Sequence, residues 1–202
     1  NIICAGTPWP ADNSIAIDTF HKIEALFNAG IKIHLHYFHT KPDCHPTELN
    51  KYCESVRSYQ SGKSKNGLPD KTSDGNNEMI TIINNDNYPV LFEGLNSTGI
   101  LHQIEKLGRK IIVRMHNDEC RHADHLKNIS GSFFEKIRLK RNSQDIKKYE
   151  DSLPQHCLYA FSNADNAIHS KEDHGLINAK YLPVFLPFKG ITGKTGVGNF
   201  CL

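Results

Sequence analysis

The chain has 202 residues, of which 38% are hydrophobic and 23% charged, and its formal net charge is +2. These values are typical of a globular domain with one well-buried core. The small net charge argues against nucleic acid as a partner, and no run of about eighteen apolar residues predicts a membrane-spanning helix. The six cysteines contain no CxxC pair and are sparse for a disulfide scaffold, which favours a reducing, cytoplasmic environment.

The first forty residues predict a strand, a helix and a second strand. Residues 2–6 are an apolar run of strand length. A helix begins at Asn13 or Ser14 and ends before Gly30, because apolar residues recur at helical spacing between these points. The second strand is expected over residues 31–38, where apolar and polar residues alternate.

Prolines and glycines interrupt a polar run over residues 40–87. Three elements are expected there: a short helix near 47–54, an edge strand at 56–59 and a helix at 77–85. The polar, irregular composition does not indicate which acceptor or ligand this region would recognise.

From residue 88 onward, strands and helices alternate regularly. The expected strands cover residues 89–92, 110–113, 157–161 and 180–184. The expected helices are one over 100–107, a basic one from the capping box of Ser132 and Glu135 to about Pro154, and one capped by Ser162. This alternation predicts an α/β fold: a doubly wound, mainly parallel, Rossmann-like sheet with helices on both faces.

The strand at 110–113 runs into the polar hexapeptide Arg114-Met115-His116-Asn117-Asp118-Glu119. Ligands of open α/β sheets bind at the carboxyl ends of the strands, so this hexapeptide is the first place to expect chemistry. The chain has no GxGxxG after the first strand and no GxxxxGK[ST], so neither a dinucleotide fingerprint nor a phosphate-binding loop is predicted.

Three segments, in this order, resemble the amino-terminal half of GT-B glycosyltransferases, most closely the large retaining family four. They are Gly-Thr-Pro-Trp-Pro-Ala-Asp-Asn at 6–13, Tyr-Pro-Val-Leu-Phe-Glu-Gly at 88–94, and the hexapeptide. The likeness continues through residues 138–140, 148–150, 162–165 and 182–185, and so spans nearly the whole chain. It implies two Rossmann-like domains facing a cleft, the first holding the acceptor and the second the nucleotide sugar.

The resemblance implies that residues 1–187 form the acceptor-side domain and that residues 188–202 hold a linker and the first strand of a donor-binding domain. The whole enzyme would be cytoplasmic and of bacterial type. It would transfer a sugar from a nucleotide diphosphate sugar to a glycan or lipid-linked acceptor, with retention of configuration. Because most of the donor site would lie beyond these residues, the chain alone is expected to be inactive. The resemblance implies no cofactor and no metal.

The resemblance also implies roles for individual residues. His116 would be catalytic, because an imidazole that lines the sugar subsite can bond a hydroxyl or support developing charge. The alternative is that His116 only satisfies backbone groups of its loop. Substrate contacts are expected from seven residues that end strands or follow them: Asp12, Asn13, Glu93, Gly94, Arg114, Asn117 and Glu119.

Several of these residues have equally good structural interpretations. Asn13 can cap the first helix and Asp12 can form the turn before it. Arg114 is expected to form an ion pair with Glu93 or Glu119, in preference to binding an anionic ligand. These alternatives stay open at the level of sequence.

The basic residues between 136 and 148 suggest a peripheral contact with the inner membrane surface. Such a contact would suit a lipid-linked acceptor, because cationic side chains attract anionic headgroups. Acidic residues interrupt the run, however, and a solvated helix face is the alternative.

Two other functions compete with glycosyl transfer. Cys120, His122, Asp124 and His125 resemble the metal-binding HxHxDH motif of metallo-β-lactamase-like zinc hydrolases, with cysteine in the first place. That family needs an antiparallel, β-rich sandwich, which the alternating pattern of this chain does not predict. The third function is a non-enzymatic carbohydrate-binding module, because one fold can serve many functions.

Overall fold

Seven strands form one parallel sheet in the order β3-β2-β1-β4-β5-β6-β7. The structure is a computed structural model that describes residues 1–39, 46–61, 68–69, 74–104, 108–116, 126, 129, 131 and 133–188. The strands are β1 Ile2–Cys4, β2 His34–His39, β3 Ser55–Gln60, β4 Val90–Glu93, β5 Ile111–Met115, β6 Leu158–Phe161 and β7 Ala179–Tyr181. The predicted fold class, a doubly wound, Rossmann-like α/β sheet, is confirmed.

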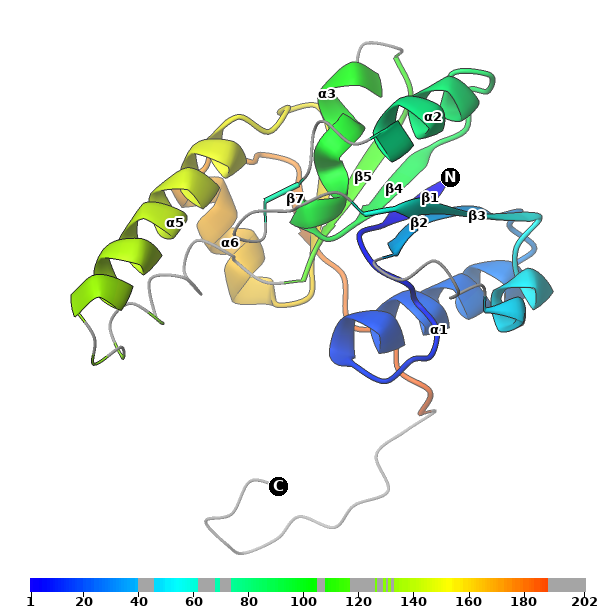
Figure 1. Cartoon of the computed structure of the whole chain (residues 1–202), viewed down its shortest axis with the longest axis horizontal. Helices are drawn as coiled ribbons and strands as arrows, with labels where there is room; N and C mark the ends of the chain where they lie inside the picture. The colour runs from blue at the N-terminus through cyan, green and yellow to red at the C-terminus, as the bar shows by residue number, and fades with distance from the viewer. Residues whose placement is uncertain are drawn as a thin grey trace, which may run out of the picture.

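Helices cover both faces of this sheet (Figure 1). The α-helices are α1 Ser14–Asn28, α2 Asp74–Ile83, α3 Leu101–Ile104, α5 Phe133–Asp151 and α6 Ala164–Asp173, and the 3₁₀ turns are η1 Thr47–Lys51 and η2 Leu95–Ile100. No helix within the described ranges is long and apolar enough to cross a bilayer.

Two apolar cores lie on opposite faces of the sheet. Neighbouring residues of a strand point to opposite sides, and so Ile2 packs in one core while Ile3 packs in the other. The first core joins β1 and β2 to α1, whose Phe20 and Ile23 are buried against the sheet. The second, larger core joins the sheet to α2, η2, α3, α5 and α6.

The winding direction of the chain changes between β1 and β4. β1 pairs with β2 on one side and with β4 on the other, so the connections that follow these two central strands lead in opposite directions. In open α/β sheets this switch point leaves a crevice at the carboxyl ends of the strands, where ligands bind. The ends of β1 and β4 are therefore the expected position of a site.

The structure corrects several predicted boundaries. The second strand begins at His34 rather than at residue 31, and the predicted helix at 47–54 is the 3₁₀ turn η1. The helix expected at 100–107 is preceded by η2 and ends its described part at Ile104. The most informative difference is at β5, which continues to Met115, because pairing with β4 and β6 on both sides extends its ladder through Arg114.

Candidate functional site

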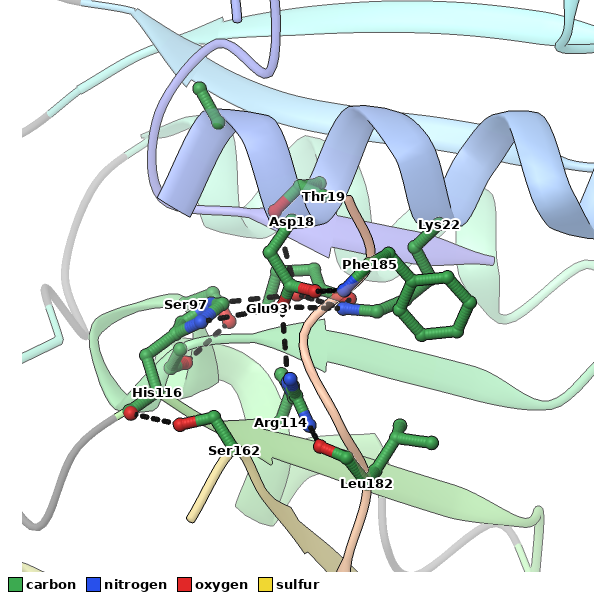
Figure 2. Close-up of polar contacts among 12 residues, drawn as sticks. Asp18, Thr19, Lys22, Glu93, Ser97, Arg114, His116, Ser162, Leu182 and Phe185 are labelled. Atoms are coloured by element: carbon green, nitrogen blue, oxygen red, sulfur yellow. Dashed lines mark hydrogen bonds and ion pairs between the residues drawn. The ribbon is translucent and has the colours of Figure 1, made fainter. Parts of the chain in front are cut away.

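Four charged side chains meet beside the switch point (Figure 2). Helix α1 brings Asp18 and Lys22, one helical turn apart, to the sheet. Glu93 is the last residue of β4, and Arg114 of β5 lies opposite it in the parallel register. These four residues, Asp18, Lys22, Glu93 and Arg114, are called the ion cluster below.

Ion pairs link all four residues of the ion cluster, from Glu93 through Lys22 and Asp18 to Arg114. The Lys22 Nζ donates to both Glu93 oxygens, at 2.8 and 2.9 Å, and to Asp18 Oδ2 at 3.3 Å. The Arg114 Nε donates to the same Asp18 oxygen at 3.1 Å. No member is more than 3% exposed. Two positive and two negative charges therefore balance in a dry environment, where an unpaired charge would cost several kcal/mol.

Asp18 is charged because of its neighbours. Burial by itself would raise the pKa of the Asp18 carboxyl, but Lys22, the Phe185 backbone N–H and Arg114 outweigh burial and lower it. The pKa thus lies below the usual value of 3.8, and Asp18 is a carboxylate at neutral pH.

The His116 ring lies between the two carboxylates, one residue beyond β5. Its Nδ1 is 3.6 Å from Asp18 Oδ2 and its Nε2 is 3.5 Å from Glu93 Oε2, while the side chain is 10% exposed. Within the described part of the chain, Nε2 is buried and makes no hydrogen bond. The backbone of His116 is held from β6, because the Ser162 hydroxyl donates to its carbonyl at 2.5 Å. His116 is thus positioned between two carboxylates, and its Nε2 makes no hydrogen bond.

A pocket of about 210 Å³ opens beside the ion cluster, at the switch point. Its lining is mixed. Five residues bring hydroxyl, amide or carboxylate groups, and the others are small or apolar: Thr7, Asn13, Thr19, Glu93 and Asn96, with Cys4, Ala5, Gly6, Pro8, Ile15 and Ala16. The Thr7 hydroxyl finds no hydrogen-bond partner among the residues that the structure describes. Pockets for drug-sized ligands begin at about 300 Å³, so this one suits a smaller group.

Gly94 is the residue that makes room at the end of β4. Its φ is +88°, a left-handed conformation that other residues rarely adopt. A Cβ at this position would lie 2.8 Å from the Asn96 side-chain oxygen and 3.6 Å from a carbon of the His116 ring. A side chain here would therefore push directly on the pocket wall and approach the imidazole.

The structure brings some of the predicted site residues together and separates others. Glu93, Gly94, Arg114 and His116 lie side by side at the ends of β4 and β5. Arg114 is completely buried and pairs with Asp18. Of its two predicted partners, Glu119 lies outside the described residues, and Glu93 is wrong. The reason is that Lys22 already occupies both Glu93 oxygens.

Asn13 and Asp12 lie at the beginning of α1. The Asn13 side chain accepts a hydrogen bond from the Ala16 backbone N–H at 3.0 Å, so its cap interpretation is confirmed, and Asn13 also lines the pocket. Asp12 is exposed and accepts from the Asn13 side chain at 3.1 Å. Asn117 and Glu119, the other two predicted contacts, lie outside the described residues.

Sequence reasoning missed Asp18 and Lys22. Asp18 and Lys22 are an oppositely charged pair at positions i and i+4 of a helix, next to apolar positions. This pattern is equally typical of an exposed pair on a helix surface. Ser162 was assigned as a helix cap, which is wrong. Asn163 caps α6 by accepting from the Asp165 N–H at 2.7 Å, and this leaves Ser162 to hold the His116 loop.

Asp18, Glu93 and His116 also offer three metal-ligating atoms within 4.8 Å of one another. Carboxylates and imidazole are suitable ligands for several divalent cations. However, Lys22 and Arg114 already neutralise the two carboxylates, and a metal ion would have to displace the Lys22 ammonium. The contacts therefore fit an ion cluster better than a metal site.

Two other predicted features can be placed only in part. The cysteine, histidine and aspartate residues of the zinc motif, at positions 120–125, lie outside the described residues, and the parallel sheet is not the antiparallel sandwich that the motif requires. The basic residues of α5 are all exposed: Lys136, Arg138, Lys140, Arg141, Lys147 and Lys148. Their contact with a membrane stays a prediction.

No protein-family model matches the chain, and neither does any curated protein. The fold shows a Rossmann-like α/β domain, and folds of this kind serve many activities. A function therefore has to be argued from the position and the chemistry of the site.

Proposed function

We propose that this chain is the acceptor-side domain of a nucleotide-sugar-dependent glycosyltransferase, which transfers a sugar to a glycan or lipid-linked acceptor. The observation that carries the proposal is His116, which stands at the carboxyl end of β5 with an unbonded, buried Nε2. The switch-point pocket beside the ion cluster supplies hydroxyl and amide groups, which suit a hydroxyl-rich ligand. The resemblance of residues 6–13, 88–94 and 114–119 adds the reaction type, transfer with retention.

Each residue of the site has a role in this proposal. The His116 imidazole would bond a hydroxyl of the transferred sugar and stabilise charge that develops next to it. Asp18 and Glu93 hold the ring from both sides, and Ser162 holds its backbone. The nucleotide would bind to a second domain, and catalysis by this domain would rest on positioning.

Turnover by the parent protein tests the proposal. The parent protein is incubated with uridine, guanosine and adenosine diphosphate sugars, and release of the nucleoside diphosphate is measured. We expect release from one donor class, and His116→Ala should slow it about 100-fold, the usual effect of removing one preorganised donor. The thermal unfolding of the variant should match that of the unchanged protein.

His169→Ala is the matched control, because His169 lies on α6 with a side chain that is 36% exposed. This variant should keep full activity. A folded His116→Ala protein with undiminished release would refute the catalytic role, and the absence of release from every donor would favour the carbohydrate-binding module.

The proposal also predicts a second Rossmann-like domain in the parent protein. We expect the coding sequence beyond Leu202 to continue for roughly 150 residues of alternating strands and helices. A parent protein that contains this domain alone would contradict transfer between two facing domains. It would move the carbohydrate-binding module ahead of the glycosyltransferase.

A further inference from the structure

The segment that follows β7 returns across the molecule to the ion cluster. Residues 182–188, called the strap below, run from the end of β7 towards α1 (Figure 1). Arg114 donates one hydrogen bond to the Leu182 carbonyl and another, of 3.2 Å, to the Pro183 carbonyl. The Phe185 backbone N–H donates to Asp18 Oδ1 at 2.7 Å. The strap is therefore held by two members of the ion cluster.

Most of the strap's apolar side chains contribute little to this attachment. Val184, Leu186 and Phe188 are 43%, 55% and 73% exposed. The Phe185 ring contacts the cluster as well, with Lys22 Nζ 5.6 Å from its centroid. Hydrogen bonds to buried charges thus carry much of the attachment, and such bonds are about twice as strong as neutral ones.

Asp18 is the residue that the strap and the candidate site share. Its Oδ1 accepts from Phe185, while its Oδ2 accepts from Arg114 and Lys22 and lies 3.6 Å from His116 Nδ1 (Figure 2). A carboxylate is planar and rigid, so its two oxygens move together. A rotation that changes the contact with His116 also changes the hydrogen bond to Phe185.

We propose that Asp18 couples the position of the His116 ring to the attachment of the strap. A ligand that draws the imidazole towards the pocket would rotate the carboxylate and loosen the strap. Release of the strap would in turn free the carboxylate and let His116 move, because coupling between two sites is reciprocal. Asp18 is a positioning residue in this scheme, since it acts on a ligand only through His116.

The inference goes beyond the proposed function and does not depend on it. It rests on contacts within the chain, and it can be tested without donor or acceptor. Failure of the glycosyltransferase assay would leave the coupling untouched, and failure of the coupling would leave the assay valid.

Amide hydrogen exchange and the side-chain NMR signals of His116 test the coupling in the full chain. Asp18→Asn removes the charge that holds the strap. We expect the Phe185 amide, whose N–H donates to Asp18, to exchange at least about ten-fold faster, the factor for losing one hydrogen bond to a charged group, and the His116 signals to shift. Asp165→Asn, at the exposed start of α6, is the control and should change neither measurement.

A second variant approaches the coupling from the strap. Phe185→Pro removes the N–H that donates to Asp18, together with the ring beside Lys22, and keeps all four charged side chains of the ion cluster. Folding of this variant is therefore not challenged by an unpaired buried charge. We expect the His116 signals to shift in this variant too. Faster exchange of the strap with unshifted His116 signals would overturn the proposal, as would an unchanged strap in a folded Asp18→Asn protein.

Discussion

Individual residues at the centre of this molecule are charged where a Rossmann-like sheet usually has apolar contacts. Arg114 is completely buried within a central strand, and Glu93 opposite it is 2% exposed. Such a pair is tolerated only because α1 supplies the two complementary charges, Lys22 and Asp18. The ion cluster thus links α1 to β4 and β5 through paired charges.

Replacing one member of the ion cluster should destabilise the protein strongly. Lys22→Met leaves the buried Glu93 carboxylate unpaired, and we expect a loss of about 3–5 kcal/mol in the free energy of unfolding, measured in urea. Lys51→Met is the matched control, because the Lys51 side chain is 64% exposed and pairs with Glu48 on the surface. Its effect should be far smaller than that of Lys22→Met, because exposed ion pairs contribute little to stability.

The double variant Lys22→Met, Glu93→Leu separates loss of pairing from loss of packing. We expect it to recover most of the stability that Lys22→Met loses, because the buried charge is removed together with its partner. Burial indicates that the ion cluster is shielded from water. Equal destabilisation by Lys22→Met and Lys51→Met would contradict this.

For helices and strands, local sequence signals predicted that an element exists more accurately than where it begins and ends. The helical spacing around Phe20 and Ile23 identified α1, and the alternation of apolar residues identified β2. The missed boundaries are those that tertiary contacts decide. β5 continues through Arg114 because strands pair on both of its sides, and η2 precedes α3 where a regular helix start was expected.

The contribution of Asn13 to the start of α1 can be tested by substitution. Its side chain satisfies the Ala16 N–H, one of the amides that a helix start leaves unpaired. We expect Asn13→Ala to lower the free energy of unfolding by about 1 kcal/mol and Asn13→Ser to lower it much less. If both variants keep full stability and both lose activity in the parent protein, the residue contributes to ligand binding rather than to the cap.

The whole molecule is held by two cores and by buried polar contacts between strands. His36 lies between β1 and β3, is 1% exposed, and bonds the Tyr59 hydroxyl at 2.8 Å. Burial, with the nearby positive charges including Arg57, lowers the pKa of His36 from 6.5 to about 4. The folded protein therefore binds a proton at His36 less readily than the unfolded chain does.

This difference makes stability depend on pH. With a folded pKa below the unfolded one, the contribution of His36 is fully present above pH 6.5 and is lost as the pH falls towards about 4. Between pH 7 and pH 5 we expect the free energy of unfolding to fall by about 2 kcal/mol on account of this residue. Denaturant titrations at the two pH values measure the change.

A variant without the imidazole checks the assignment. His36→Gln should have a lower stability at pH 7 and a smaller loss between pH 7 and pH 5 than the unchanged protein. The window lies above the lowered pKa of Asp18, so protonation of that carboxylate does not interfere. An undiminished loss in His36→Gln would assign the pH dependence to other groups.

Local patterns in the amino-acid sequence were enough to predict the α/β class and the doubly wound sheet, and they offered Asn13 or Ser14 as the cap of the first helix. Periodicity and turn chemistry act over a few residues, and these features can be read from neighbouring positions. Their position after strands also identified Glu93, Gly94 and His116 as residues that meet at one edge of the sheet, because parallel strands end together.

The ion cluster and the strap were decided by tertiary structure alone. Asp18, Glu93, Arg114 and Phe185 are far apart in the chain, and no local pattern shows which charge pairs with which. Lys22 contacts both carboxylates, Arg114 contacts Asp18, and Arg114 also donates to the strap. The choice depends on how α1 lies on the sheet, and the packing of two apolar surfaces sets that arrangement.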